Sequence, residues 1–137
     1  MGGDDIYSCS KGCSELITNA YHKSFFQNSS CQIASTRAGN VLGGGDWADY
    51  RLVPDIFRSL KDKQKLKIRN PDSVRPWQHV LDPLAGYLTL AEKLYVTKEE
   101  FCEGWNFGPD EEGTISVIDL ITKLQDISGI NLHIEIE

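Results

Sequence analysis

Two residues near the start of the sequence, Tyr7 and Lys11, have types and a spacing that suit acid–base chemistry. Residues four apart share one face of a helix, so the phenol and the ammonium group would point the same way. An ammonium group within about 4–6 Å stabilises a phenolate, and a tyrosine tuned in this way can exchange a proton with a substrate hydroxyl. The same spacing also occurs in ordinary pairs on helix surfaces, so the pair alone does not decide the function.

The elements that would position this pair begin with a helix. Apolar residues recur with helical spacing from Ser8 to Phe26, and the short β-branched segment Cys31–Thr36 predicts a buried strand. Residues 37–46 are rich in glycine and predict a loop. The triple glycine at 43–45 lacks the spacing of a phosphate-binding loop and fits a substrate-side loop better.

The rest of the sequence alternates helices with short strands, which indicates the α/β class. A helix is predicted over Pro54–Lys63, with Ile56, Phe57 and Leu60 facing inward. Pro76 makes a central strand position unfavourable for the extended segment around it. The remaining predicted elements are a strand at 66–69, a helix capped by Asp82 and running to about Tyr95, a strand at 104–108, a helix from Ser116 to Ser128 ended by Gly129, and a strand at 131–137.

Length and composition limit the class of protein. The chain has 137 residues, enough for one ordinary domain, with 40% hydrophobic and 25% charged residues. A net charge of −6 argues against nucleic acid as a partner, because phosphate binding needs clustered Lys and Arg. No apolar run reaches the roughly 18–20 residues that span a bilayer, and the N-terminus lacks the layout of a signal peptide. We therefore expect a cytoplasmic location and no membrane partner.

The four cysteines favour neither disulfides nor a metal site. There is no C-x-x-C pair, and Cys9 and Cys13 stand one helical turn apart among apolar neighbours. We expect Cys9, Cys13, Cys31 and Cys102 to be buried free thiols in a reducing compartment, and we expect no metal.

The stretch "YSCSKGCSEL" resembles the active-site helix of the short-chain dehydrogenase/reductase superfamily, in its extended, nucleotide-sugar-modifying branch. The strings "RAGNVLGGGDW", "RPWQHV" and "EGWNFGPD" follow in the order and spacing of a 4,6-dehydratase of this branch. Together these blocks cover Asp4 to about Asp110.

The resemblance implies the C-terminal part of an extended Rossmann-type fold. The glycine-rich dinucleotide-binding half of that fold has no counterpart among these residues. Within one domain of residues 1–137, about 1–46 would be a remnant of the catalytic Rossmann part, and about 47–137 the substrate-binding part.

The resemblance also implies a reaction and its cofactor. With NAD bound, the complete enzyme would convert the nucleotide sugar CDP-glucose into CDP-4-keto-6-deoxyglucose and water, a lyase step in deoxysugar biosynthesis. Tyr7 would be the acid/base, and Lys11 would bind the nicotinamide ribose and lower the tyrosine pKa. Arg37 would lie near the cofactor, with a structural ion pair as the alternative.

Four further residues are implied in substrate binding: Asn40, Arg51, Arg75 and Gln78. Guanidinium groups suit diphosphate oxygens, although Arg51 could instead be solvated ahead of a helix and Asn40 could form an Asx-turn. Trp77 and His79 would line the same wall, and His79 is not assigned a proton-transfer role. Trp47 and Trp105 are expected to pack in the core or a loop rather than to stack on a base.

Two alternatives remain open at this stage. The chain could belong to another NAD-dependent nucleotide-sugar epimerase or dehydratase, or it could be a non-enzymatic folded remnant that self-associates. In either case we expect no activity from these residues alone. We also expect a homo-oligomer, because a partial parallel sheet exposes strand edges and apolar surface, and because the Tyr7 helix resembles one that pairs across a dimer.

Overall fold

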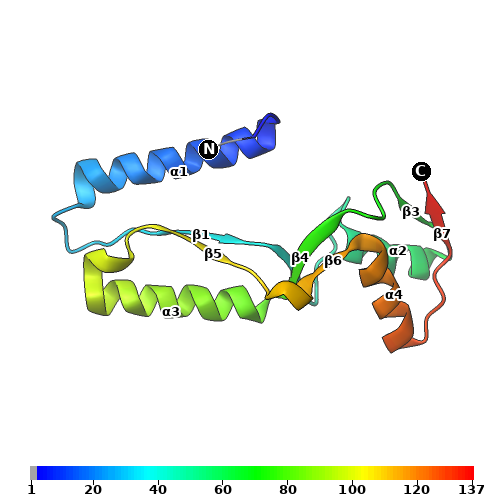
Figure 1. Ribbon diagram of the computed structural model, residues 1–137. Coiled ribbons are helices and arrows are strands. Elements are labelled where there is room, and N and C mark those ends of the chain that lie inside the picture. The colour runs from blue at the N-terminus through cyan, green and yellow to red at the C-terminus, as the bar shows by residue number, and fades with distance from the viewer. Residues whose placement is uncertain (1–2) are drawn as a thin grey trace. The chain divides into compact units, whose positions relative to one another are not determined.

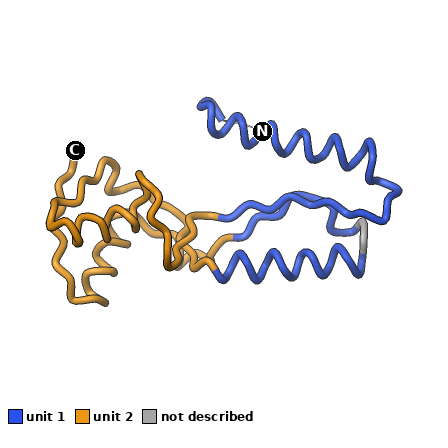
Figure 2. Tube along the Cα trace, turned by 180° about the vertical axis from the view of Figure 1, so that it is seen from behind, with its two compact units in different colours: residues 1–38, 81–107 blue, residues 39–80, 108–137 orange. Residues whose placement is uncertain are grey.

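The computed structural model describes residues 3–137, apart from the side chains of residues 98 and 99. The chain forms two compact units that interleave along the sequence (Figure 2). Unit 1 comprises Met1–Ala38 and Leu81–Phe107, and unit 2 comprises Gly39–Val80 and Gly108–Glu137. The predicted α/β class is confirmed within each unit. The functional division near residue 46 stays a prediction.

Unit 1 is a helix–strand–helix arrangement. Strands β1 (Ser35–Ala38) and β5 (Gly104–Phe107) pair in parallel, with Arg37 opposite Asn106. Helix α1 (Ile6–Tyr21) lies on one side of the two strands and α3 (Leu81–Thr97) on the other (Figure 1). Helix α1 continues as a π-helical turn (His22–Phe26), and α3 as a 3₁₀ turn (Lys98–Phe101).

Helix α1 turns its polar face towards the strands. Tyr7, Lys11 and Glu15 line a pocket shared with β1, whereas Leu16 and Ile17 are each 58% exposed, and no residue of α1 is buried. The predicted apolar stripe therefore exists but faces outward. The prediction of buried thiols is wrong: Cys9 and Cys13 are exposed because they belong to this stripe, Cys31 is exposed as well, and Cys102 is half-buried.

The first strand lies later in the chain than the sequence predicts. The segment Cys31–Thr36 is strand only at its last two residues, and Ser35 is half-buried rather than buried. Part of the predicted loop at 37–46 is strand instead, because Arg37 and Ala38 pair with β5 and residues Asn40–Leu42 form β2. Only Gly39 interrupts these two short strands.

Unit 2 contains two small sheets, two helices and an apolar core. One sheet has the order β2-β4-β6, with β4 at Val74–His79 and β6 at Thr114–Ser116, and the other pairs β3 (Leu66–Ile68) with β7 (Ile134–Ile136). The helices are α2 (Leu52–Asp62) and α4 (Val117–Ser128), and a 3₁₀ turn spans Glu111–Gly113. The buried core residues are Ile56, Leu66, Ile68, Ile121 and Leu132.

Pro76 occupies the middle strand of a sheet, contrary to the prediction. Strand β4 has neighbours on both sides, but they pair with different halves of it. Parallel β2 pairs with residues 77–79, and antiparallel β6 pairs with residues 74–76. Pro76 therefore pairs with a strand on one side only. Because no second strand pairs with Pro76, its missing N–H removes no hydrogen bond to a second strand.

The helix boundaries agree with the sequence to within about two residues. Ser116 caps α4 by accepting from the amide N–H of Asp119 at 3.1 Å, and Gly129 ends it with φ of 67°, both as predicted. Helix α3 begins at Leu81, so Asp82 lies in its first turn rather than before it. In α2 the side chain of Phe57 is 49% exposed and does not face inward as expected.

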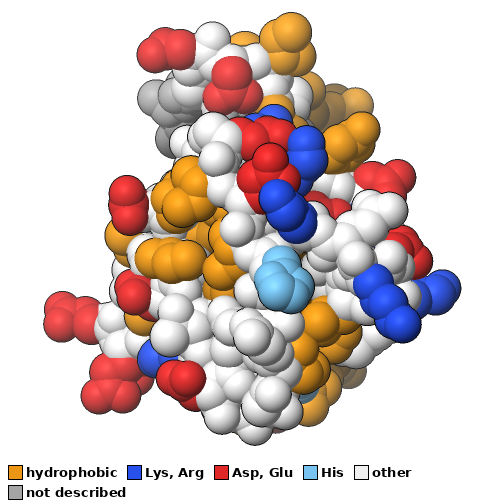
Figure 3. All heavy atoms as spheres, turned by 90° about the vertical axis from the view of Figure 1, so that its right-hand side faces the viewer, with side chains coloured by type: hydrophobic (Ala, Val, Ile, Leu, Met, Phe, Trp, Pro, Cys, Tyr) orange, Lys and Arg blue, Asp and Glu red, His pale blue; other side chains and the backbone are white. Residues whose placement is uncertain are grey.

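The surface carries charges of both signs. Figure 3 shows acidic and basic side chains interspersed with apolar ones on the face that it presents. Two ion pairs link β3 and β7 or the residues next to them: Lys67 Nζ lies 3.1 Å from Glu137 Oε1, and Lys65 Nζ lies 3.8 Å from Glu135 Oε2. Across residues 3–137, no helix combines the length and the apolar character that crossing a membrane requires.

Candidate active site

Tyr7 and Lys11, the predicted acid–base pair, lie beside each other in unit 1. Asp5 caps α1 by accepting from the amide N–H of Ser8 at 2.9 Å, and the helix then carries Tyr7 and Lys11 in its first two turns. Lys11 Nζ lies 5.3 Å from the centre of the Tyr7 ring. That distance is within the range of a cation–π contact. The Tyr7 side chain is 70% exposed, so a substrate can reach the phenol.

A pocket of about 710 Å³ separates this part of α1 from strand β1. Tyr7, Lys11 and Glu15 line one side of it, and residues 35–38 line the other. Hydroxyl, ammonium and carboxylate groups thus surround a space large enough for a hydroxylated ring.

Arg37 forms the structural ion pair that was the alternative to a cofactor contact. Its Nε lies 2.7 Å from Glu15 Oε1 and its Nη2 lies 2.8 Å from Glu15 Oε2, and Nη1 donates to Asn106 Oδ1 at 3.0 Å. Ser35 Oγ donates to the same carboxylate at 2.6 Å. The hydrogen bonds from Arg37 and then from Ser35 lower the pKa of Glu15 to about 2.

Sequence reasoning missed Glu15. It follows Lys11 by four residues and Tyr7 by eight, so the helical spacing of these two residues extends to it. That spacing is the signal that could have identified Glu15 as a third residue on the same face.

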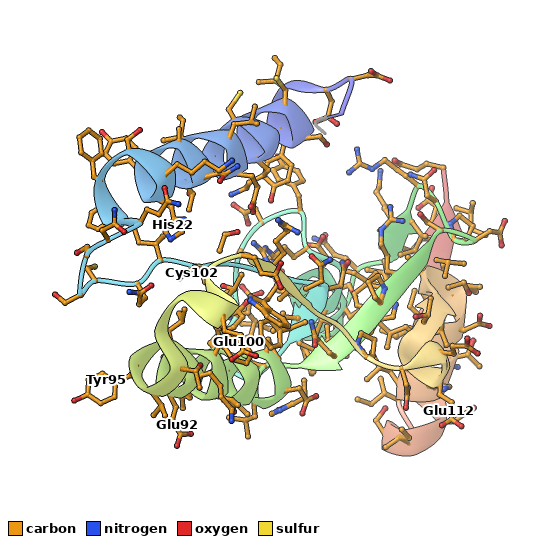
Figure 4. The ribbon with its side chains drawn as sticks, turned by 60° about the vertical axis from the view of Figure 1, so that its left-hand side comes forward. His22, Glu92, Tyr95, Glu100, Cys102 and Glu112 are labelled. Atoms are coloured by element: carbon orange, nitrogen blue, oxygen red, sulfur yellow. The ribbon has the colours of Figure 1, made fainter. Side chains whose placement is uncertain are left out.

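A smaller pocket, of about 180 Å³, lies further along α1 and includes His22 and Cys102, both labelled in Figure 4. The Nε2 atom of His22 is buried and has no hydrogen-bond partner among the described residues. Cys102 Sγ lies 2.9 Å from Gln32 Oε1. No cluster of three or more metal-binding side chains occurs within residues 3–137 where side chains are described.

The residues predicted to bind the substrate lie in unit 2. Asn40 of β2 stands opposite Trp77 of β4, and Arg75 and Trp77 share one face of β4 because they are two residues apart. Gln78 projects from the opposite face and is only 6% exposed. The paired strands β2 and β4 thus place Asn40, Arg75 and Trp77 on one face of the sheet and Gln78 on the other.

Arg51 lies in an exposed loop before α2, and the structure reveals the residue that holds this loop. Arg58 of α2 donates to the carbonyl oxygens of Trp47 at 2.8 Å and Ala48 at 3.0 Å. Arg58 also forms ion pairs with Asp55 and Asp49.

The two tryptophans outside β4 differ in their surroundings. Trp47 is 61% exposed, so the expectation that it packs in the core or a loop is wrong. Trp105 does pack as expected: its ring lies 5.6 Å from that of Phe101, and its indole N–H donates to the Phe101 carbonyl.

The described residues fit one end of a dinucleotide. Tyr7 and Lys11 line the larger pocket and can donate hydrogen bonds to ribose hydroxyls. A pyrophosphate would need a glycine-rich turn leading directly into a helix. In the described chain the glycines at 43–45 do not provide this, because the next helix begins only at Leu52.

The chain matches the NAD dependent epimerase/dehydratase family over residues 4–101, and it belongs to that family. It is 51% identical over 134 residues to CDP-glucose 4,6-dehydratase of Salmonella typhimurium. The resemblance inferred from the motifs is thereby confirmed. The match covers 94% of this chain but 37% of the relative, so the chain spans little more than a third of that protein's length.

Solved structures agree with the fold. UDP-glucuronic acid 4-epimerase from Bacillus cereus, in complex with UDP-glucuronic acid and NAD, matches with a TM-score of 0.75 and 23% identity, over 95% of this chain and 38% of that one. dTDP-glucose 4,6-dehydratase from Bacillus anthracis, in complex with NAD, also matches with a TM-score of 0.75, at 20% identity, over 100% of this chain and 41% of that one. The predicted fold, part of an extended Rossmann-type structure, is confirmed.

Proposed function

We propose that this chain supplies the acid/base pair and the nucleotide-sugar-binding part of an NAD-dependent CDP-glucose 4,6-dehydratase. The observation that carries the proposal is the 51% identity to such an enzyme over 94% of the chain. The contact between Lys11 and the Tyr7 ring supports it, because it keeps an ammonium group beside the phenol. The predicted roles of Tyr7, Lys11 and the four substrate-binding residues are part of this proposal, whereas Arg37 enters it through its ion pair with Glu15 beside the same pocket.

The proposed chemistry assigns one task to each group. Tyr7 takes the proton of the sugar 4-hydroxyl as the carbon beneath it is oxidised, and the Lys11 ammonium stabilises the resulting phenolate. When bound, NAD would supply the hydride acceptor for the oxidation at C4 and the hydride donor for the reduction at C6. Between these events the new ketone acidifies C5, and water leaves across C5 and C6. The nucleotide sugar therefore loses one water and no net electrons.

The substrate contacts come from unit 2 in this proposal. Arg75 presents an exposed guanidinium, which can form paired hydrogen bonds with diphosphate oxygens. Its Nη1 donates to the neighbouring Val74 carbonyl at 2.8 Å, leaving other donors for a ligand. Asn40 would add an amide on the same face, and Arg51 a second cation.

A titration of the full chain with CDP-glucose, followed by tryptophan fluorescence, tests the binding role. We expect saturable binding without NAD, and Arg75→Ala should weaken it about tenfold, the effect of losing one charged contact. Arg69→Ala is the matched control, because Arg69 is an exposed arginine of the same unit. No response to CDP-glucose at any concentration would contradict the proposal.

A second experiment tests the acid/base role. The chain replaces the matching segment of the Salmonella relative, and conversion of CDP-glucose is followed by mass spectrometry. We expect turnover, and Tyr7→Phe should reduce it by about 10²–10⁴-fold. Tyr21→Phe, on the same helix, should leave it unchanged. Equal rates for the two variants would refute the role of Tyr7.

Self-association is proposed from the exposed apolar residues of α1 and of the π-helical turn that continues it. Ile6 of α1 is 91% exposed and Phe25 of the turn is 69% exposed, and the stripe between them includes Leu16 and Ile17, each 58% exposed. Burying such a stripe against a second copy would stabilise both helices. Sedimentation that shows only a monomer at high concentration would contradict this, and would also weaken the alternative of a non-enzymatic self-associating remnant.

A further inference from the structure

The link between Glu15 and Arg37 belongs to a larger polar cluster that joins three elements of unit 1. We call it the clamp: Glu15 of α1, Ser35 and Arg37 of β1, and Asn106 of β5. Both carboxylate oxygens of Glu15 are used, one by Arg37 Nε at 2.7 Å and the other by Ser35 Oγ and Arg37 Nη2 at 2.6 and 2.8 Å. Arg37 Nη1 extends the cluster to Asn106 Oδ1 at 3.0 Å.

The neighbouring strand leaves room for this guanidinium. A Cβ atom on Gly104, which stands opposite Ser35, would lie 2.3 Å from Arg37 Nη2. Arg37 also pairs with Asn106 across the two strands, so its fork is held from both sides. A bidentate arginine–carboxylate pair fixes direction as well as distance.

Helix α1 has little else to fix it against the strands. No residue of α1 is buried, and the pocket of about 710 Å³ lies between its first turns and β1. Within the described chain, the other side-chain hydrogen bonds of α1 stay inside the helix or its cap: Ser8 to Asp5, Ser10 to the Tyr7 carbonyl, Ser14 to the Ser10 carbonyl, and Thr18 to the Ser14 carbonyl.

We propose that Glu15 is a positioning residue: through the clamp it sets the distance and rotation of α1, and so aims Tyr7 and Lys11 into the pocket. The inference rests on the proposed function of that pair. Glu15 follows Tyr7 by eight residues, or roughly 12 Å along a helix, and shares its face. A rotation of α1 at the clamp would therefore turn the phenol away from the pocket.

The clamp is suited to geometry more than to stability. The side chain of Glu15 is 22% exposed and that of Arg37 is 44% exposed, so solvent screens their attraction. Loss of the clamp should hence change where α1 lies without unfolding the unit. A shift of α1 in a folded protein would therefore indicate a positioning role, whereas unfolding would indicate a merely structural one.

Distance measurement on the full chain tests the position of α1 directly. Spin labels are placed at Cys13 and at Glu92→Cys, both exposed and on the helices flanking the two strands, with the other cysteines changed to serine. Glu15→Gln should at least double the width of the distance distribution. Glu100→Gln, which removes the same charge from an exposed turn of unit 1, should leave the width unchanged (Figure 4).

Kinetics of the chimera with the Salmonella relative give the functional measurement. Glu15→Gln should lower kcat by about 10–100-fold with KM for CDP-glucose within twofold, because a misplaced acid/base group affects chemistry more than binding. Arg37→Lys should widen the distance distribution as well, since it keeps the charge but loses the fork.

The outcomes separate the clamp from the proposed function. An inactive chimera with the native chain would defeat the proposed function, while the distance distribution still decides whether the clamp positions α1. A width and a kcat in Glu15→Gln equal to those of Glu100→Gln would overturn the inference. A fall in activity that only follows the folded fraction would overturn it too.

Discussion

The two units of the chain hold themselves together by different means. Unit 2 buries a cluster of apolar side chains in which Ile121 is fully buried and Ile56 is 3% exposed. In unit 1 no residue of α1 is buried, and its link to the strands is the polar clamp around Glu15 and Arg37. The unit with the predicted substrate residues thus has a clustered core of its own, whereas in unit 1 the buried apolar residues Pro83 and Leu90 lie on α3, and α1, which carries Tyr7 and Lys11, depends on a few polar contacts.

This difference has a consequence for the chemistry. A cooperative apolar core resists local opening, while an exposed helix held by polar contacts can move at a lower free-energy cost. We therefore expect the face with Asn40 and Arg75 in unit 2 to keep its geometry. The orientation of Tyr7 and Lys11 should be the part most sensitive to mutation and conditions.

The largest contrast should come from equal truncations in the two units. Ile121→Ala removes a fully buried side chain from the core of unit 2 and should lower the free energy of unfolding by about 3 kcal/mol. Leu16→Ala in α1 removes a side chain that is 58% exposed and should change it by less than about 0.5 kcal/mol. Urea denaturation measures both, and equal losses would contradict the comparison.

Unit 1 does contain one tightly packed place, and filling it should have an intermediate effect. A Cβ on Gly86 of α3 would lie 2.3 Å from two atoms of the Phe107 ring, which also contacts Tyr87 edge-on at 5.3 Å between ring centres. Gly86→Ala should destabilise the chain by about 1–2 kcal/mol, because the overpacking outweighs the better helix propensity of alanine. An increase in thermal stability would show that the ring shifts aside freely.

The sequence predicted most elements because their signals are local. Ser116 and Gly129 mark the ends of α4 by capping chemistry that needs no tertiary partner. The spacing of Tyr7 and Lys11 likewise predicted a pair on one helix face, and the structure places them in contact. The motif strings then identified the family, which the comparison confirms.

The sequence-based predictions that failed concern features that depend on tertiary contacts. The burial of Cys9 and Cys13 could not be predicted, because a helical stripe does not show which way the helix turns it. Pro76 fits a middle strand only because β2 and β6 pair with different halves of β4. The clamp was invisible for a similar reason: Glu15 and Arg37 are 22 residues apart and meet through tertiary structure.

The helix caps allow the comparison to be repeated with smaller changes. Asp5 caps α1 and Ser116 caps α4, each by accepting from an amide N–H three residues on. Alanine at either position should remove about 1 kcal/mol of helix stability. Amide hydrogen exchange should show the loss of Asp5 as fraying confined to the first turn of α1. The loss of Ser116 should appear throughout α4, which the buried Leu120 and Ile121 tie to the core. The same local pattern in both helices would remove the distinction between the units.

The smallest expected effect is the response of the clamp to acid. The hydrogen bonds from Arg37 and Ser35 hold the pKa of Glu15 at about 2, against a usual value of 4.5. A carboxyl with a lowered pKa contributes stability above its unfolded pKa and loses it as the pH falls towards its folded pKa. The clamp should therefore be intact at neutral pH and weaken between about pH 4.5 and 2, by no more than about 1 kcal/mol because both side chains are partly exposed.

Amide hydrogen exchange measures this response. In the native chain, the amides of unit 1 should lose protection in this pH range. In Glu15→Gln they should be less protected at neutral pH and lose less protection on acidification. A variant that loses protection as steeply as the native chain would show that other carboxyl groups, rather than Glu15, set the acid response of this unit.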